Sequence, residues 1–270
     1  MSAPRIAAIS PAKQELLLRM LRARREAPQP PAAMTVEQML AEAVLPADID
    51  PAMAAPPSAA PATFLLTGAT GFIGAYLLDA LRTRNRAPIY CLVRAADAAE
   101  AKARLAANLA VYGLAPPDDN VVAAPGDLAA PRLGLDAAAF ERLAGETDAI
   151  LHCGALVKWT YPYAALRGAN VEGTLEVLRL ATRGRLKPVH FISTVGVFSS
   201  GEHRGGAVLE TTPLEDSGSL AVGYAQSKWI AEKLVRLAGA RGLPVAIYRP
   251  NTGPDSRSGA FNTSDYISQI

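Results

Sequence analysis

Two residues four positions apart, Tyr224 and Lys228, are the pair best suited by type and spacing to acid–base chemistry. Side chains at this spacing lie on one face of a helix, one turn from each other. A phenol has an ordinary pKa of about 10, which makes it a poor proton donor at neutral pH. A neighbouring ammonium favours the phenolate and lowers that pKa toward the working range. Because many surface helices carry this spacing by chance, its meaning depends on the elements around it.

A glycine-rich segment at 67–74 provides this context, because it separates an apolar run at 64–66 from a helical pattern of leucines. Glycines at a strand-to-helix turn allow a tight bend, a close approach of pyrophosphate and close packing of helix on strand. The free amides of the helix N-terminus then face the phosphates. A tight turn of another kind is the alternative, which the flanking strand and helix disfavour. The predicted cofactor contacts are Gly68, Thr70, Gly71, Phe72, Ile73 and Gly74.

The rest of the chain alternates short apolar runs with helical patterns. Strands are predicted at 63–66, 89–93, 121–124, 149–152, 189–193 and 245–248, and helices at 72–84, 97–112, 136–144, 164–183 and 222–240. Most of these strands are continuous apolar runs, as expected where both faces are covered. The alternation predicts an α/β fold with a doubly wound parallel sheet of the Rossmann type, which binds ligands at the carboxyl ends of its strands.

The second predicted strand is followed by an arginine, Arg94. Many folds that use NAD place an acid here to hold the ribose hydroxyls, whereas an arginine suits a 2′-phosphate. Arg104, one or two helical turns later, could add a second positive charge. The predicted cofactor is therefore NADPH, with a solvated basic helix as the alternative explanation.

Residues after the third and fourth strands are also candidates for the cofactor site. Asp127 could accept a hydrogen bond from the adenine amino group while Leu128 walls the ring, although a simple turn aspartate is the alternative. His152 is interpreted as a packing or backbone-bonding residue rather than a catalyst. Three small residues follow where the backbone must pass the cofactor: Cys153, Gly154 and Ala155.

Two hydroxyls end the fifth strand, Ser193 and Thr194, where side chains point into the ligand crevice. By position we assign the substrate carbonyl to Thr194, with Ser193 as the alternative. A strand-end hydroxyl that bonds its own backbone is the non-catalytic interpretation. We expect Lys228 to hold the nicotinamide ribose as well, and Pro250, after the sixth strand, to place backbone near the nicotinamide amide.

Composition narrows the classes of partner. The 270 residues are half hydrophobic and carry a formal net charge of only +2, so nothing indicates nucleic acid or an anionic membrane as partner. No apolar run reaches the roughly 18 residues of a membrane span. The two cysteines, Cys91 and Cys153, are interpreted as reduced core thiols of a cytoplasmic protein, and no metal site is expected.

The Gly-x-x-Gly-x-x-Gly spacing resembles the extended branch of the short-chain dehydrogenase/reductase superfamily. In that superfamily an asparagine at the position of Asn170 can help organise a proton relay, so we include it in the cofactor site, with capping or packing as the alternative. Roughly residues 45–270 resemble thioester reductase domains of nonribosomal peptide synthetases, polyketide synthases and carboxylic acid reductases. The segments that carry this resemblance are 64–74, 91–95, 152–157, 161–163, 170–174 and 249–256.

The resemblance implies NADPH-dependent reduction of an acyl or peptidyl thioester to an aldehyde, in some members onward to an alcohol. The implied partner is a carrier protein that presents the thioester on its phosphopantetheine arm. We expect Thr194 and Tyr224 to polarise the carbonyl, with Tyr224 as proton donor assisted by Lys228. The alternatives are a sugar-nucleotide epimerase or dehydratase of the extended branch, and a non-catalytic NADP-binding or docking fragment.

Three regions are predicted along the chain. Residues 1–25 contain a basic helix at 11–25, interpreted as a solvated covering helix or a docking helix. Residues 26–61 are predicted to be a Pro/Ala-rich linker with a short helix capped by Thr35, and 62–270 an NADP-binding reductase domain. Family members continue past a segment like 259–265 into a helical substrate domain. We therefore expect that domain to be largely missing from this chain, and the chain to bind NADPH with weak or no reduction.

Overall fold

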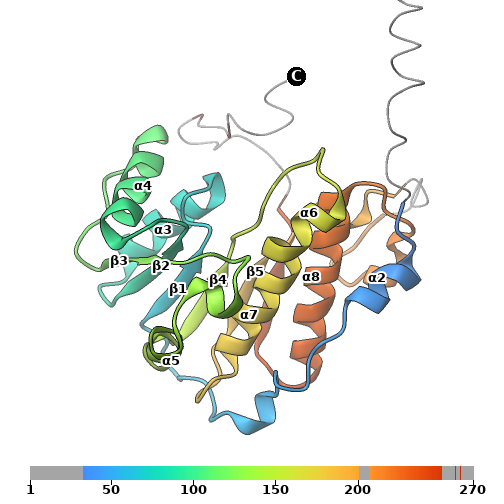
Figure 1. Cartoon of the computed structure of the whole chain (residues 1–270), viewed down its shortest axis with the longest axis horizontal. Helices are drawn as coiled ribbons and strands as arrows, with labels where there is room; N and C mark the ends of the chain where they lie inside the picture. Colours follow the sequence, from blue (N-terminus) through green and yellow to red (C-terminus); the bar gives the residue numbers. More distant parts are fainter. Residues whose placement is uncertain (1–32, 201–206, 251–258, 260–261, 263–270) are drawn as a thin grey trace, which may run out of the picture. The chain divides into compact units, whose positions relative to one another are not determined.

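One parallel sheet of six strands organises the computed structural model, which describes residues 33–200, 207–250, 259 and 262 (Figure 1). The strands are β1 (Phe64–Thr67), β2 (Ile89–Val93), β3 (Val121–Pro125), β4 (Ala149–His152), β5 (Val189–Ile192) and β6 (Val245–Tyr248). Their order, β3-β2-β1-β4-β5-β6, confirms the predicted doubly wound arrangement, and each strand lies within one residue of its predicted bounds. The order reverses between β1 and β4, so the ligand crevice is expected at the carboxyl ends of these strands.

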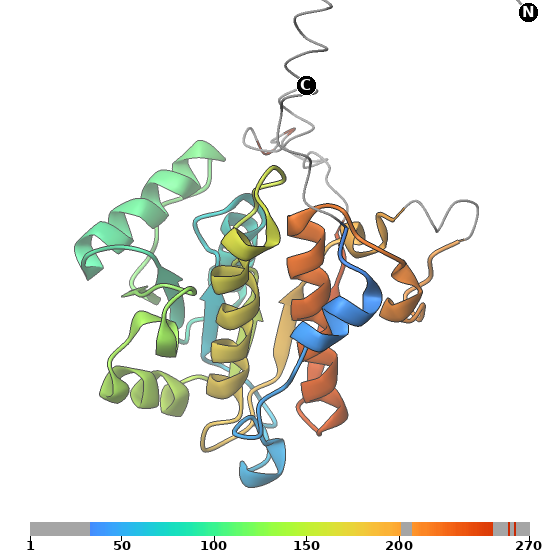
Figure 2. The ribbon, with the colours of Figure 1, turned by 45° about the vertical axis from the view of Figure 1, so that its right-hand side comes forward.

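Helices cover both faces of the sheet. On one face pack α3 (Phe72–Arg84) and α4 (Ala98–Val111). On the other pack α5 (Ala137–Glu146), α7 (Gly173–Ala181) and α8 (Gly223–Ala240), with α7 and α8 side by side (Figure 1, Figure 2). Short 3₁₀ helices lie in the connections: η1 (Pro51–Met53), η2 (Pro131–Gly134), η4 (Val195–Phe198) and η6 (Leu214–Ser217). The central strands thus lie between two apolar layers, which is why they read as continuous apolar runs.

The helix predicted at 164–183 is divided into three parts. These are α6 (Tyr163–Arg167), a π-helical turn η3 (Gly168–Glu172) and α7. The wider π turn contains the buried Asn170, whose Oδ1 accepts the Leu156 amide at 2.6 Å. Its Nδ2 donates to Oγ of Ser227 on α8 at 2.9 Å. A π turn inserted in an α-helix often marks a functional site, and here it ties the loop after β4 to α8.

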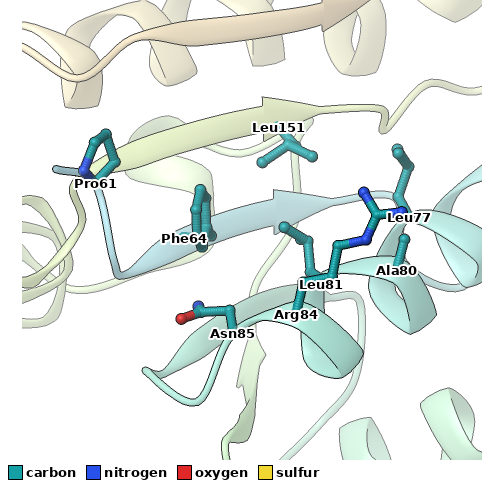
Figure 3. Close-up of a pocket in the computed structure, with 8 residues that line it drawn as sticks. All are labelled: Pro61, Phe64, Leu77, Ala80, Leu81, Arg84, Asn85 and Leu151. Atoms are coloured by element: carbon teal, nitrogen blue, oxygen red, sulfur yellow. The ribbon is translucent and has the colours of Figure 1, made fainter.

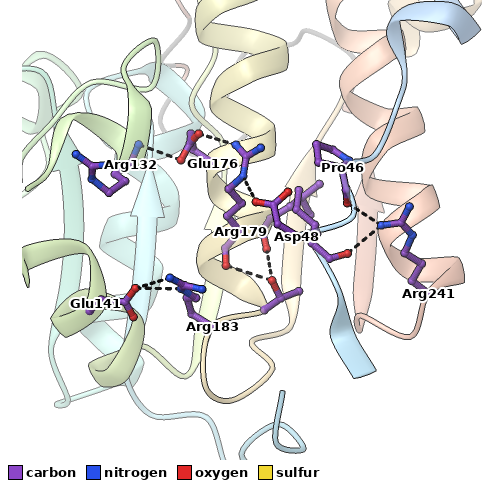
Figure 4. A network of polar contacts seen from close by, with 11 residues as sticks. Pro46, Asp48, Arg132, Glu141, Glu176, Arg179, Arg183 and Arg241 are labelled. Atoms are coloured by element: carbon purple, nitrogen blue, oxygen red, sulfur yellow. Dashed lines mark hydrogen bonds and ion pairs between the residues drawn. The ribbon is translucent and has the colours of Figure 1, made fainter. Parts of the chain in front are cut away.

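Residues 33–61 fall within the segment predicted to be a linker, but they pack on the folded domain. The compact unit of that domain begins at Ala33. Thr35 caps α2 (Val36–Glu42) as predicted, within a capping box completed by Gln38. Beyond this helix, Arg241 at the end of α8 donates to the backbone carbonyls of Leu45, Pro46 and Ile49. Asp48 pairs with Arg179 of α7 at 2.7 Å (Figure 4). The Pro/Ala-rich composition suggests a linker but does not reveal these long-range contacts.

Met39 on α2 provides a test of this docking. Its side chain is fully buried, whereas that of the adjacent Leu40 is 38% exposed. We expect Met39→Ala to lower the free energy of unfolding by about 2–5 kcal/mol, because it removes buried methylenes and leaves a cavity. Leu40→Ala, on the exposed side of the same helix, should change it by less than about 1 kcal/mol. Urea denaturation of the two variants would contradict the docking if their midpoints were equal.

A surface groove of about 320 Å³ lies between α3 and strands β1 and β4 (Figure 3). Its lining residues are Pro61, Phe64, Leu77, Ala80, Leu81, Arg84, Asn85 and Leu151. Phe64 begins β1 and Arg84 ends α3, so much of this groove lies toward the amino ends of the strands. Doubly wound folds bind their ligands at the opposite edge, and the cofactor site is therefore built elsewhere.

Candidate active site

The turn between β1 and α3 is shaped by its glycines. Gly68 has a φ of 75°, and a Cβ there would lie 2.6 Å from the backbone nitrogen of Gly154. A Cβ on Gly74 would lie 2.0 Å from the carbonyl oxygen of Gly68, so α3 approaches the turn only because residue 74 is glycine. A Cβ on Gly71 would meet only that same oxygen, at 3.4 Å, which leaves the N-terminus of α3 open. This cradle fits a dinucleotide pyrophosphate, which the amides of the first turn of α3 would face.

Asn108 on α4 holds the cradle from outside. Its Nδ2 donates to the carbonyl oxygens of Ala69 and Gly71, both at 3.2 Å. This residue was not predicted from the sequence, because the local helical pattern of α4 does not indicate which loop a side chain reaches. Asn108 therefore fixes two carbonyls of the turn, while the Gly71 amide donates to the Gly68 carbonyl at 3.0 Å.

Three other predicted residues lie in the turn or at the start of α3. Phe72 packs edge-on against Tyr76 and Tyr112, with ring centroids 5.4 Å and 5.2 Å away. Ile73 is partly exposed, and Thr70 precedes the helix in the turn itself. The Phe72 side chain thus serves the packing of α3, so any contact of this residue with a cofactor would come from its backbone.

Arg94 and Arg104 come together at the carboxyl end of β2. Nη1 of Arg104 donates to the backbone carbonyl of Arg94, which places both residues at one corner of the sheet. Both are exposed. Two cationic residues at this corner could receive a 2′-phosphate, as the sequence predicts.

The loop after β3 borders the cradle. Cδ1 of Leu128 lies 2.6 Å from the place a Cβ on Gly154 would take, so Leu128 and the small residues after β4 are neighbours. Oδ1 of Asp127 accepts the amide of Ala129 at 2.9 Å. This Asx turn is the structural role considered for Asp127 from the sequence, and it holds the loop beside the predicted adenine position.

A buried chain of hydrogen bonds joins β1, β4 and α7. Thr67 Oγ1 accepts the Gly154 amide at 2.9 Å and lies 2.7 Å from Nδ1 of His152. Nε2 of His152 lies 3.1 Å from Oγ1 of Thr174, which donates to the carbonyl of Asn170 at 2.7 Å. Since Thr174 gives its hydrogen to that carbonyl, it accepts from Nε2–H, and Nδ1 accepts from Thr67. Burial lowers the pKa of His152 to about 3, so the ring is neutral. His152 is thus a buried structural residue, as interpreted from the sequence, although its ring bonds two threonine hydroxyls rather than the backbone.

Lys228 lies against the end of β5. Its Nζ donates to the carbonyl oxygen of Ile192 at 2.7 Å and lies 4.0 Å from the centre of the Phe191 ring. Burial lowers the pKa of Lys228 to about 8, while Cys153 and Glu232 oppose that shift. The helix that carries Tyr224 and Lys228 is therefore anchored directly beside the strand end.

The two hydroxyls after β5 have different partners. Ser193 donates to the fully buried Glu232 at 2.6 Å, and Arg249 pairs with the same carboxylate at 2.5 Å. Oγ1 of Thr194 accepts the amide of Gly196 at 3.1 Å, at the start of η4. This is the local backbone contact of the non-catalytic interpretation, and it leaves the hydroxyl hydrogen of Thr194 available to another acceptor. Ser193 thus ties β5 to α8 and to the residue after β6. This leaves Thr194 as the better candidate to contact a substrate.

The remaining predicted positions surround this centre. Tyr224 is 8% exposed, and its ring lies 5.2 Å from that of Trp159, a residue that was not predicted from the sequence. Asn170 holds the backbone of Leu156 and contacts α8, and Pro250 lies exposed directly after Arg249. The segment at 249–256 that carries part of the resemblance extends beyond the described residues. The predicted helix at 11–25 lies entirely outside them.

Within the described part of the chain, two kinds of feature are absent. No helix there combines the length and apolarity needed to cross a bilayer. The same residues contain no group of three or more His, Cys, Asp or Glu side chains arranged to hold a metal ion.

A doubly wound sheet with its cradle after β1 and a Tyr/Lys helix beside β5 is the arrangement of an NAD(P)-binding domain of the extended short-chain dehydrogenase/reductase type. Residues 66–270 match the family model described as Male sterility protein. The chain belongs to this family, and within it to the terminal reductase (R) domains of nonribosomal peptide and polyketide synthases. The resemblance found in the sequence is thereby confirmed.

Three relatives illustrate this membership. The chain is 48% identical over 232 residues to a linear gramicidin synthase of Brevibacillus parabrevis, covering 82% of this chain and 4% of that protein. It is 49% identical to the terminal R domain of the myxalamid pathway, with a TM-score of 0.81, covering 87% of this chain and 60% of that one. A thiolation-reductase di-domain of an archaeal synthetase matches at 25% identity and a TM-score of 0.65, covering 86% of this chain and 49% of that one. The chain thus spans about 60% of the myxalamid R domain and a smaller share of the two other proteins.

Proposed function

We propose that this domain uses NADPH to reduce a carrier-bound acyl or peptidyl thioester to an aldehyde. The observation that carries the proposal is the contact of Lys228 with the end of β5. Nζ of Lys228 donates to the Ile192 carbonyl at 2.7 Å, and Thr194 follows two residues later. We infer that this hydroxyl, the phenol of Tyr224 and the ammonium of Lys228 act together at the carboxyl edge of the sheet, where a bound dinucleotide would present its reactive end.

Each of these three groups has a distinct task. Bound NADPH would supply the hydride that reduces the thioester carbonyl. Thr194 and Tyr224 would donate hydrogen bonds to the carbonyl oxygen, where negative charge develops. Because Oγ1 of Thr194 accepts the Gly196 amide, its own hydrogen can be directed to the substrate. Tyr224 would give its proton to that oxygen, and the ammonium of Lys228 would stabilise the phenolate that remains. Cleavage of the C–S bond in the resulting hemithioacetal then releases the aldehyde and the pantetheine thiol.

The proposed partner is an acyl or peptidyl carrier domain that presents its thioester on a phosphopantetheine arm. The relatives support this, since one solved structure joins a thiolation domain to its reductase. A cytoplasmic location is proposed with it, because Cys91 and Cys153 are both free thiols.

The proposed reaction can be tested with the protein that carries this chain. It is mixed with NADPH and an acyl-pantetheine thioester, and the loss of NADPH absorbance is compared with the aldehyde trapped as a hydrazone. We expect one aldehyde for each NADPH, or alcohol if a second reduction follows. A sugar nucleotide in place of the thioester tests the epimerase alternative. Absence of thioester reduction by a protein that binds NADPH would overturn the proposal in favour of a non-catalytic module.

Arg94 provides a test of cofactor choice. We expect NADPH to bind more tightly than NADH, because the Arg94 guanidinium would contact the 2′-phosphate. A hydrogen bond to a charged group contributes about 1.5–3 kcal/mol, so Arg94→Ala should reduce the preference about tenfold or more. Arg86→Ala is the matched control, since Arg86 is also exposed but precedes the amino end of β2. Titration by nucleotide fluorescence checks this, and equal affinities for NADPH and NADH in the unmodified chain would contradict it.

A further inference from the structure

Trp159 lies near both of the groups proposed to hold the substrate carbonyl. Its ring centroid is 5.2 Å from that of Tyr224, with the two planes inclined at 53°. Its Cη2 atom lies 3.8 Å from the position a Cβ on Gly196 would occupy. That same position is 3.3 Å from Oγ1 of Thr194. The indole therefore lies close both to the phenol on α8 and to the segment that begins with Thr194.

The loop that carries Trp159 is fixed against the start of α8. A Cβ on Gly223 would lie 2.5 Å from the carbonyl oxygen of Tyr161 and 2.6 Å from the amide nitrogen of Tyr163. The Tyr161 amide closes a turn on the carbonyl of Lys158 at 3.2 Å. The hydroxyl of Tyr163 donates to Glu42 at 2.8 Å. Since backbone packs directly on backbone at Gly223, the indole is held in place before any ligand arrives.

Part of the indole remains in contact with solvent. Trp159 is 38% exposed. Val157, two residues before it, is 53% exposed, and Val195, directly after Thr194, is 49% exposed. Large apolar side chains left exposed beside polar catalytic groups typically mark a ligand-binding surface. The surface is apolar, whereas a pantetheine arm is rich in amides, so the apolar part of a thioester substrate is the better match.

We propose that Trp159 forms the binding surface for the acyl chain next to the thioester carbonyl. The inference rests on the proposed function, because the carbonyl between Thr194 and Tyr224 brings its first acyl carbons to the indole. Apolar carbons placed there remove both the indole and themselves from water, so affinity increases with chain length. Trp159 thereby selects substrates with an apolar acyl group.

The test uses pantetheine amides in which nitrogen replaces the thioester sulfur, so that binding is measured without reduction. Octanoyl and acetyl amides are titrated by calorimetry in the presence of NADPH, with the protein that carries this chain. We expect the octanoyl amide to bind about tenfold or more tightly than the acetyl amide, and Trp159→Ala to remove most of that advantage. Trp159→Phe should retain part of it. Tyr248→Ala is the matched control, because Tyr248 is 46% exposed and stacks with His190 on β5.

Fluorescence provides a second measurement. The chain has two tryptophans, and the other one, Trp229, is fully buried. We expect the octanoyl amide to change the emission of Trp159, and this change should be lost in Trp159→Phe. An octanoyl advantage that survives in Trp159→Ala would overturn the inference. An equal loss of affinity for both amides would also overturn it, because it would assign the indole to the pantetheine arm. Reduction of thioesters by the unmodified protein is scored separately, so the proposed function can hold when this inference fails.

Discussion

Tyr224→Phe is expected to reduce thioester turnover by about two to four decades while leaving NADPH affinity nearly unchanged. The substitution removes the proton donor and retains the ring that packs at 5.2 Å against Trp159. The fold should therefore be preserved, because the 8% exposed side chain loses only its hydroxyl. Turnover is measured as NADPH consumption with an acyl-pantetheine thioester, and affinity by fluorescence titration.

Two comparisons make this result specific. Tyr90 lies on β2, away from the proposed centre, and its phenol donates to Glu146 of α5 at 2.5 Å. Tyr90→Phe removes this phenol and should leave turnover unchanged. Lys228→Ala should lose turnover and some NADPH affinity together, because the ammonium is proposed to hold the nicotinamide ribose as well. Full turnover by Tyr224→Phe would mean that the Tyr/Lys helix is only structural.

Gly74→Ala should have the largest effect on the cofactor site. The added Cβ would lie 2.0 Å from the Gly68 carbonyl oxygen, a backbone atom that cannot move without opening the turn. We expect a loss of NADPH affinity of about a hundredfold or more, because the amides of α3 would move away from the pyrophosphate. Overpacking should also lower the free energy of unfolding by about 1–3 kcal/mol or more.

Gly145→Ala is the matched control for that substitution. Gly145 lies in α5, and a Cβ there would meet nothing within 4 Å. Since alanine is the better helix former, this variant should be about as stable as the unmodified chain or up to about 1 kcal/mol more stable. Nucleotide titration and urea denaturation measure both variants. NADPH binding by Gly74→Ala at unmodified affinity would show that the cradle is not where the cofactor binds.

The order and bounds of the sheet elements could be predicted from sequence because they depend on local properties. Continuous apolar runs such as Ile89–Val93 are typical of strands covered on both faces. The helical patterns between these runs predict parallel strands that are joined by helices. The glycine spacing at the first turn likewise records a local constraint. Glycine adopts the φ of 75° at Gly68 without strain, and a Cβ at Gly68 or Gly74 would clash with backbone atoms, so these residue types identify the turn directly.

What the sequence did not reveal depends on contacts between distant segments. The Pro/Ala-rich composition of 26–61 predicts a linker with a short helix, yet Met39 and Ile49 are fully buried in the core. The composition of a segment describes its solubility and backbone preferences, whereas its docking depends on the shape of the surface that it meets. A similar limit applies to Asn108, which reaches a turn far away in the chain.

The residue types and spacing of Tyr224, Lys228 and the hydroxyls after β5 were enough to predict a catalytic centre, because acid–base chemistry requires particular functional groups. The choice between two adjacent hydroxyls needed the tertiary structure, since Ser193 is engaged by the buried Glu232 while Thr194 is not. The position of Trp159 beside Tyr224 also emerges only when the loop after β4 packs on α8. Sequence thus determined which chemical groups are available, and tertiary packing decided which of them lie side by side, because side-chain contacts between distant segments have no local periodicity.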